Sequence, residues 1–193
     1  AAHRRLRGIK FFQTVFSSTV ATSVAVASVI FFTLVNDNIG VFRDVGWLDL
    51  TKPNSALLAV SLSAVWQNLG LTFVVVLAAL QTVPDSVLEA AALDGFGPVR
   101  RFFRITVPMI SPALLFLAVV LAVFALQAYA QMEILTGGGP AQATETLVYK
   151  IVNLQQPKDI GRGAATAIGL FFLTTLVALA QFTLLEKRVH YGD

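Results

Sequence analysis

The residues best suited to do chemistry in this chain gather in one short segment, and they are charged. The segment 85–104 holds three carboxylates and three guanidinium groups: Asp85, Glu89, Asp94, Arg100, Arg101 and Arg104. Groups of this kind form charge-assisted hydrogen bonds with oppositely charged side chains. Because the segment stands between two long uncharged stretches, we expect it to be a docking surface for a soluble partner.

Patterns typical of catalysis or metal binding do not occur in the sequence. The chain has no cysteine, and its two histidines, His3 and His190, lie near its ends without metal-ligand spacing. No Gly-x-x-x-x-Gly-Lys-[Ser/Thr] run is present to bind the phosphates of a nucleotide. The sequence therefore predicts no enzyme active site, no metal site and no cofactor in this chain.

The elements that must position the charged segment are long and apolar. Hydrophobic residues make up 56% of the chain and charged residues only 13%, which disfavours a soluble domain. Four stretches without Asp, Glu, Lys or Arg each reach the roughly 20 residues that a helix needs to cross a ~30 Å hydrocarbon core. We predict an all-α, polytopic membrane helical bundle, a single domain over 1–193, with spans at about 11–35, 64–83, 108–132 and 163–185.

Local signals divide the polar loop 84–108 into two short helices. Ser86 and Glu89 have the spacing of a capping box at the start of the first helix. Gly95, after Asp94, fits the end of that helix, since glycine tolerates the left-handed conformation. Pro98 suits the first turn of the second helix.

Three weaker patterns concern the other elements. A short interfacial helix from about Ser55 is expected to precede the span that begins near Trp66. The outer segment 141–154 is expected to form an amphipathic helix. Small residues recur every four positions at Gly161, Ala165 and Gly169, a pattern that favours close helix packing in a membrane.

The positions of lysine and arginine predict the orientation, because cytoplasmic flanks carry the excess of these residues. One set of flanks holds nine of them: Arg4, Arg5, Arg7, Lys10, Arg100, Arg101, Arg104, Lys187 and Arg188. The other holds five: Arg43, Lys52, Lys150, Lys158 and Arg162. We therefore predict that both termini and the loop 84–108 are cytosolic, and that the loops 36–63 and 133–162 are outside.

The charged segment also resembles a known motif. The run Glu89-Ala90-Ala91, with Gly95 six residues after the glutamate and Ile105 and Pro108 beyond it, resembles the EAA loop of importer permeases of the ATP-binding cassette (ABC) class. Val107 stands where leucine is usual, and Phe96 stands where alanine is common. The departure at Phe96 could alter the packing against a partner.

Further stretches narrow the resemblance within that class. The outer segment Leu135–Pro140, followed by 143–149, resembles the outer loop of permeases for sugars and for glycerol-3-phosphate. The GFGPVRRFFRI run, VYKI at 148–151 and the EKRVHY ending are similar to the A-type permease of glycerol-3-phosphate uptake systems, which has a maltose-permease-like core. Such permeases have two further spans before Phe11, so we expect that this sequence lacks the first two transmembrane helices.

The resemblance implies a type I ABC importer permease fold in a bacterial-type inner membrane. It implies a second permease subunit, two ATPase subunits that bind ATP and Mg, and an extracytoplasmic substrate-binding protein as partners. Membrane lipid is the further partner expected, and nucleic acid is not expected, because the basic residues lie beside the spans. The loop 84–108 would be the coupling helix. Its ATPase-coupling residues would be Glu89, Ala90, Ala91, Asp94, Gly95, Ile105 and Pro108.

Polar side chains inside the predicted spans are candidates for the substrate path, because lipid-facing polar groups are costly. These candidates are Gln67, Asn68, Phe124, Gln127 and Gln131. The last three would share one helical face, and corresponding stretches line the sugar site in the related maltose permease. Hydrogen bonding between helices is the alternative role for each amide.

Two functions compete with transport of glycerol-3-phosphate or a glycerophosphodiester. The predicted spans contain no lysine or arginine to hold a phosphate, so a neutral sugar or oligosaccharide stays open as the substrate. A secondary transporter or channel is the rival from another class. Because such proteins often carry ionisable residues within the membrane, the uncharged spans argue against it.

Overall fold

The computed structural model describes residues 9–36, 38–42, 45, 48–156 and 158–185. Helices are the regular elements of this part of the chain, in the order α1 (Ile9–Ser18), α2 (Val24–Val35), α3 (Pro53–Gln81), α4 (Asp85–Leu93), α5 (Pro98–Arg101), a π-helical turn η1 (Phe102–Thr106), α6 (Val107–Met109), α7 (Ser111–Leu126), α8 (Ala130–Leu135), α9 (Leu147–Asn153) and α10 (Ile160–Leu185). His3, His190, Arg4, Arg5, Arg7, Arg43, Lys187 and Arg188 lie outside the described residues.

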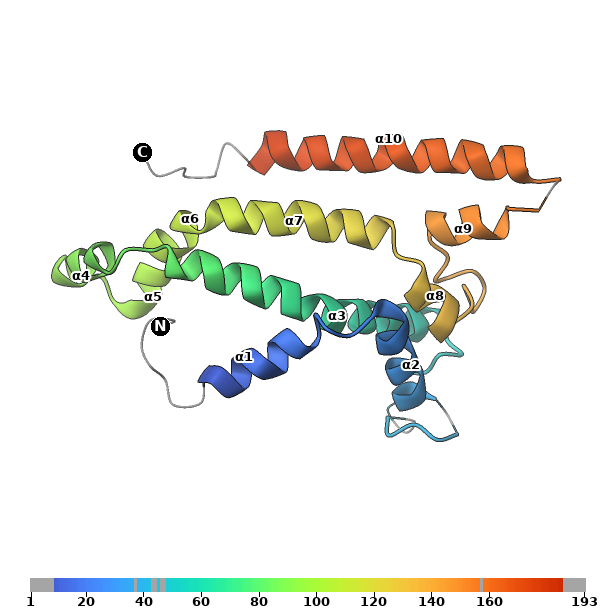
Figure 1. Ribbon diagram of the computed structural model, residues 1–193, viewed down its shortest axis with the longest axis horizontal. Helices are drawn as coiled ribbons and strands as arrows, with labels where there is room; N and C mark the ends of the chain where they lie inside the picture. Colours follow the sequence, from blue (N-terminus) through green and yellow to red (C-terminus); the bar gives the residue numbers. More distant parts are fainter. Residues whose placement is uncertain (1–8, 37, 43–44, 46–47, 157, 186–193) are drawn as a thin grey trace.

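Three long helices run side by side through the molecule (Figure 1). α7 packs against α3 on one side and against α10 on the other, while α1 and α2 pack on α3. The short helices α4, α5 and α6 gather at one end of these long helices, and α8 and α9 lie at the other end (Figure 1). The charged segment 85–104 and the glycine-rich segment 136–146 are therefore held at opposite ends of the molecule.

The prediction of one continuous helix over 11–35 is wrong, because the chain turns between Ser18 and Val24. The hydroxyls of Thr19 and Thr22 bond backbone carbonyls three and four residues earlier. Ser23 caps α2 by accepting the Val26 N–H. Serine and threonine side chains compete with helical hydrogen bonds in this way, so the cluster SSTVATS at 17–23 is the local signal that marks the break.

The segment predicted as a short helix followed by a span is one helix, α3, of 29 residues. Pro53 occupies its first turn, where the missing N–H of proline has no helical partner to lose. No proline or glycine pair interrupts the residues after it. At 1.5 Å per residue α3 extends roughly 44 Å, so its first turns must project beyond a ~30 Å hydrocarbon core or the helix must tilt.

The third predicted span is shorter and more bent than expected. α7 ends at Leu126, and α8 begins after Gln127, Ala128 and Tyr129.

Two other predicted features also differ in the structure. Helix α9 covers only part of the expected amphipathic helix 141–154, because Ala141 and Gln142 adopt positive φ angles of 49° and 62°. The small-residue stripe of α10 is exposed, and no described helix packs on Gly161 or Gly169.

The described helices include two that are long and apolar enough to cross a membrane alone, α3 and α10. A third crossing requires α7 together with the helical segment Pro98–Met109, which meets it at a bend of 68°. α2, with 12 residues, is apolar but short. The sequence-based count of four full spans is therefore not reproduced within the described residues.

Candidate coupling loop and translocation path

The helical hairpin of α4 and α5 ends in a tight turn that glycine makes possible. Gly95 has a φ of +76°. Its N–H donates to the Ala92 carbonyl (3.2 Å), and the Phe96 N–H donates to the Ala91 carbonyl (3.0 Å). This pair of bonds is the Schellman motif, which satisfies carbonyls at a helix end. The predicted helix end at Asp94–Gly95 and the predicted start at Pro98 are confirmed.

The predicted capping box at the start of this hairpin is wrong. α4 begins at Asp85, Pro84 is its N-cap, and no side chain caps it. Ser86 lies inside the first turn rather than before it. Asp85 places a carboxylate in the first turn instead, where the helix dipole favours negative charge.

The hairpin buries one face of α4 and leaves the other open. Ala91 is buried, whereas Glu89, Ala90 and Asp94 are exposed. Leu93, beside the turn, has 89% of its surface exposed. The Arg101 guanidinium donates to the Leu88 carbonyl across the hairpin (3.2 Å), which braces α5 against α4.

Ile105 and Pro108 lie on the second arm of the loop, where both are half-buried. The turn Phe102–Thr106 is π-helical, and the Val107 N–H donates to the Phe102 carbonyl. Pro108 has no N–H and its ring would crowd the carbonyl four residues earlier, which is the physical reason for the wider turn.

Gln67 joins α3 to the break between α1 and α2. Its amide nitrogen donates to the carbonyls of Thr22 (2.6 Å) and Thr19 (3.4 Å). One turn later, Gly70 lets the chain approach closely, since a Cβ there would lie 2.8 Å from the Phe16 carbonyl oxygen. In the described structure Gln67 therefore has the interhelical role, and its buried Oε1 has no hydrogen-bond partner.

The remaining path candidates do not form one site. The Asn68 amide donates to the Ala64 carbonyl of its own helix (2.8 Å). Phe124 is half exposed on α7, Gln127 caps the end of that helix, and Gln131 is buried on α8. The predicted common face of Phe124, Gln127 and Gln131 is wrong, because the helix ends between them.

Gln127 does line a cavity of about 360 Å³ between α7, α9 and α10. Thr174 adds a hydroxyl to it, and the other lining residues are Val148, Ile151, Ala167, Leu170 and Phe171. The cavity holds no charged group. The Gln127 amide can donate or accept a hydrogen bond there, and the Thr174 hydroxyl, which already donates to backbone carbonyls of α10, can accept one beside the Phe171 ring.

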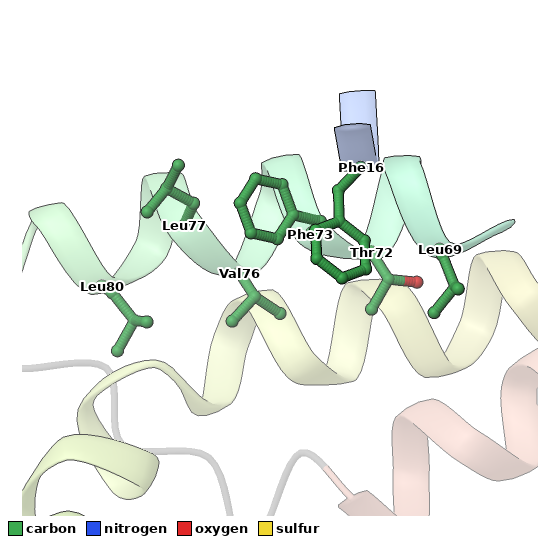
Figure 2. Close-up of a pocket in the computed structure, with 7 residues that line it drawn as sticks. All are labelled: Phe16, Leu69, Thr72, Phe73, Val76, Leu77 and Leu80. Atoms are coloured by element: carbon green, nitrogen blue, oxygen red, sulfur yellow. The ribbon is translucent and has the colours of Figure 1, made fainter. Parts of the chain in front are cut away.

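A second cavity of about 280 Å³ lies between α1 and α3, and Figure 2 shows its lining. The Phe16 ring of α1 stacks on the Phe73 ring of α3, with 5.1 Å between the ring centroids. Apart from Thr72, the lining is apolar: Phe16, Leu69, Phe73, Val76, Leu77 and Leu80. This cavity suits hydrocarbon rather than a polar solute.

The glycine-rich segment 136–146 folds onto itself through threonine hydroxyls. Thr144 is buried and bonds both the Thr136 hydroxyl (2.6 Å) and the Gly139 carbonyl (2.9 Å). Gly138, with a φ of +81°, lies against the buried Tyr149 ring. Together with Val60, Met132 and Leu135, Tyr149 forms a core cluster that anchors this segment to α3 and α8.

Sequence reasoning missed Gln181, which links α10 to α7. Its amide nitrogen donates to the Ala118 carbonyl (3.3 Å), and its Oε1 is buried without a partner. The available signal was a lone amide in an otherwise apolar stretch of α10. Among the described residues no group of His, Cys, Asp or Glu side chains could hold a metal ion.

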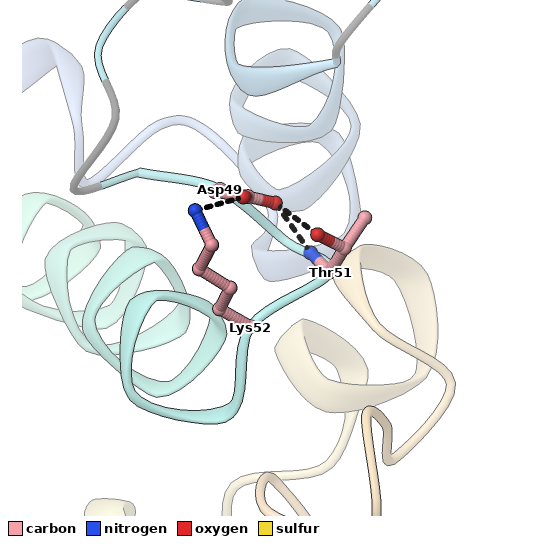
Figure 3. A network of polar contacts seen from close by, with 3 residues as sticks. All are labelled: Asp49, Thr51 and Lys52. Atoms are coloured by element: carbon pink, nitrogen blue, oxygen red, sulfur yellow. Dashed lines mark hydrogen bonds and ion pairs between the residues drawn. The ribbon is translucent and has the colours of Figure 1, made fainter.

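Asp49 lies just before the start of α3 and bonds Thr51 and Lys52 (Figure 3). It accepts hydrogen bonds from the Thr51 hydroxyl and the Thr51 N–H, and it pairs with the Lys52 ammonium at 2.9 Å. Bonds from the Thr51 hydroxyl, then Lys52, lower the pKa of Asp49 from 3.8 to about 2. The carboxylate therefore stays ionised beside the helix start, where the dipole favours it.

Comparison with known proteins identifies the family. Residues 1–191 match the family described as the binding-protein-dependent transport system inner membrane component. The chain belongs to this family. It is therefore a multi-pass component of an inner membrane, and its relatives are transport permeases rather than enzymes.

Two relatives show how much of a family member the chain represents. It is 38% identical over 194 residues to the sn-glycerol-3-phosphate transport system permease protein UgpA of Yersinia enterocolitica, covering 96% of this chain and 66% of that protein. It is 37% identical over 204 residues to UgpA of Agrobacterium fabrum, covering 100% of this chain and 68% of that protein. The chain thus spans about two thirds of their length.

A solved structure confirms the fold. All of this chain superposes on 70% of a chain in the crystal structure of a bacterial alginate ABC transporter in complex with an alginate pentasaccharide-bound periplasmic protein, with a TM-score of 0.83. The sequence identity is 20%, so this likeness concerns the fold. The all-α importer-permease fold predicted from the sequence is confirmed.

Proposed function

We propose that this family member is a permease subunit of an ATP-driven importer, and that the α4–α5 hairpin is where ATPase subunits act on it. The observation that carries the proposal is Leu93, which is 89% exposed at the tip of a braced turn. Burying a leucine side chain in a partner's cleft is worth about 2 kcal/mol. Glu89, exposed on the same helix, would add a charge-assisted contact with the partner.

The hairpin is suited to transmit a push because its internal contacts are fixed. The Schellman turn at Gly95 and the bond from Arg101 to Leu88 hold its two arms together. One arm joins α3, and the other joins α7 through η1 and α6. Closure of two ATPase subunits would therefore move both long helices, a rigid-body switch of the kind that couples distant sites.

The same proposal assigns the other partners and the orientation. A second permease subunit and an extracytoplasmic binding protein would complete the importer, with the hairpin in the cytosol and the α8–α9 end outside. The coupling set is Glu89, Ala90, Ala91, Asp94, Gly95, Ile105 and Pro108. The family description supports the binding protein, since it names binding-protein-dependent transport.

The proposed substrate is sn-glycerol-3-phosphate or a glycerophosphodiester, which the similarity to the UgpA proteins supports. Within the described helices, α3 and α7 carry no lysine or arginine, and the only one in α10 is Arg162, near its first turn. Gln127 and Thr174 would therefore face the hydroxyls, and the phosphate would be held by another subunit. A neutral sugar is the second candidate, because the uncharged cavity at Gln127 suits it equally.

The coupling proposal is tested by Leu93→Asp and Glu89→Ala in the complete transporter reconstituted in nanodiscs. We expect Leu93→Asp to lower the copurified ATPase subunit and the ATPase activity stimulated by the binding protein by roughly tenfold or more. Glu89→Ala should reduce the same two quantities less strongly. Gln142→Asp, which adds the same charge at an exposed outer position, is the matched control and should behave like the unaltered protein.

Full ATPase association and stimulation in the Leu93→Asp protein would show that the hairpin is not the docking element. The substrate is a separate question. It is addressed by competition of labelled sn-glycerol-3-phosphate uptake with unlabelled glycerophosphodiesters and neutral sugars. Competition by sugars alone would favour the second candidate without affecting the coupling proposal.

A further inference from the structure

The helical segment Pro98–Met109 lies across the direction of α7 rather than along it. The two meet at 68°, with only Ile110 between them. Where α7 crosses the bilayer, a segment turned by this angle runs close to the membrane plane, at the depth where the span begins. Helices in this position bury apolar side chains at the headgroup boundary and present basic side chains to the headgroups.

The exposed side chains of this segment have that composition. Phe102 and Phe103 form an edge-to-face pair with 5.1 Å between their centroids, and 46% and 65% of their surfaces are exposed. Arg100 and Arg104 flank them and are exposed. The segment contains no aspartate or glutamate. Apolar surface and positive charge therefore meet in one short stretch.

Arg100 and Arg104 differ from three of the described cations at the opposite end of the molecule. There, Lys52 pairs with Asp49 at 2.9 Å, Lys150 with Glu145 at 3.5 Å, and Arg162 with Asp159 at 3.6 Å. Among the described residues no carboxylate forms an ion pair with Arg100 or Arg104. Arg100 lies 4.7 Å from the centroid of the Phe96 ring, a contact that leaves its charge uncompensated.

Arg101 has a structural role in this loop that Arg100 and Arg104 do not share. Its guanidinium is committed to the Leu88 carbonyl and is half-buried. It holds the hairpin together, whereas Arg100 and Arg104 are exposed. Guanidinium groups bind phosphate oxygens through paired hydrogen bonds.

We infer that Pro98–Met109 is a binding site for anionic lipid, in which Arg100 and Arg104 contact a headgroup phosphate and Phe102 and Phe103 enter the acyl region. The site lies on the second arm of the loop and includes Ile105 and Pro108 of the proposed coupling set, whereas the proposed ATPase contacts at Glu89 and Leu93 lie on α4. A basic side chain near an anionic membrane surface is worth about fivefold in affinity. The two arginines together should therefore favour anionic over zwitterionic lipid by roughly 25-fold.

Native mass spectrometry of the complete transporter tests this inference, with dioleoylphosphatidylglycerol and dioleoylphosphatidylcholine titrated in turn. In the double variant Arg100→Gln/Arg104→Gln we expect the affinity for phosphatidylglycerol to fall by roughly 25-fold and the affinity for phosphatidylcholine to stay the same. The double lysine variant should keep most of the preference. Arg162→Gln removes one cation that is already paired with a carboxylate, and it should leave the preference unchanged.

Two results would overturn the inference. One is an unaltered preference for phosphatidylglycerol in the double glutamine variant. The other is loss of the copurified ATPase subunit from that variant while the lipid preference persists, which would assign the arginines to the protein interface. Comparison with Leu93→Asp keeps the two sites distinct, since that variant should lose the ATPase subunit and retain the lipid.

Discussion

At the residue scale, hydroxyl and amide side chains bond backbone carbonyls that the interrupted helices leave unpaired. The Thr146 hydroxyl donates to the Ala128 carbonyl at 2.7 Å, and Gln67 donates to the Thr22 carbonyl at 2.6 Å. An unsatisfied backbone group in hydrocarbon costs several kcal/mol. A polar side chain within a span of this protein is therefore not by itself a sign of substrate contact.

Gly138 supplies a prediction at this scale. Alanine there would combine a φ of +81° with a Cβ only 2.7 Å from the Tyr149 ring. We expect Gly138→Ala to lower the stability of the segment 136–149 by about 2–4 kcal/mol, because the costs of backbone strain and overpacking add. Differential scanning fluorimetry of the purified transporter, with hydrogen exchange over 136–149, measures the loss.

Gly137→Ala is the matched control for this change. Gly137 has a φ of +56°, and nothing lies within 4 Å of its Cβ position. For Gly137→Ala we therefore expect only the cost of backbone strain, about 1–2 kcal/mol. Equal losses in the two variants would contradict the assigned contact between Gly138 and Tyr149.

At the scale of elements, the junction between α1 and α2 depends on α3. Gly70 allows the two segments to touch, and the Gln67 amide donates to the carbonyls of Thr19 and Thr22 in the turn. A discontinuous helix at membrane depth is tolerated only where other groups satisfy its backbone. The break between α1 and α2 therefore depends on their contacts with α3.

Removal of the Gln67 amide tests this dependence. Gln67→Leu leaves the Thr22 carbonyl without its partner, and we expect a destabilisation of about 1–3 kcal/mol. The amides at 20–27 should exchange faster with solvent. Asn68→Leu is the control, because the Asn68 amide bonds only the Ala64 carbonyl of its own helix. Similar exchange at 20–27 in both variants would show that Gln67 does not hold the junction.

At the scale of the whole molecule, the charged hairpin and the glycine-rich segment lie at opposite ends of the long helices (Figure 1). This separation allows one end to meet ATPase subunits while the other meets a binding protein. Because the two ends are far apart, labels placed at each end can show which of them faces the cytosol.

Cysteine labelling measures that orientation, because the chain contains no cysteine. Leu93→Cys and Gln142→Cys place a thiol at exposed positions of the two ends. We expect a membrane-impermeant maleimide to label Leu93→Cys only in inverted vesicles stripped of the ATPase subunit, and Gln142→Cys only in intact spheroplasts. Labelling of both from the same side would contradict the proposed topology.

The sequence by itself determined the features whose causes are local. Uncharged stretches identified a membrane protein of helices, and the left-handed tolerance of Gly95 and the fixed φ of Pro98 positioned the hairpin correctly. The EAA-type spacing was sufficient to identify the permease class. Each of these signals acts through composition or through a few neighbouring residues, so no distant contact was needed to interpret it.

Only the tertiary structure decided which distant contacts hold the breaks in the other apolar segments. α7 ends near Ala128, whose carbonyl is taken by Thr146, 18 residues away, and the α1–α2 turn is held by Gln67, 45 residues from Thr22. These bonds compensate for helical bonds that the breaks remove, and local propensity does not encode them. For the same reason Phe124, Gln127 and Gln131, aligned on a predicted continuous helix, lie on separate elements in the folded chain.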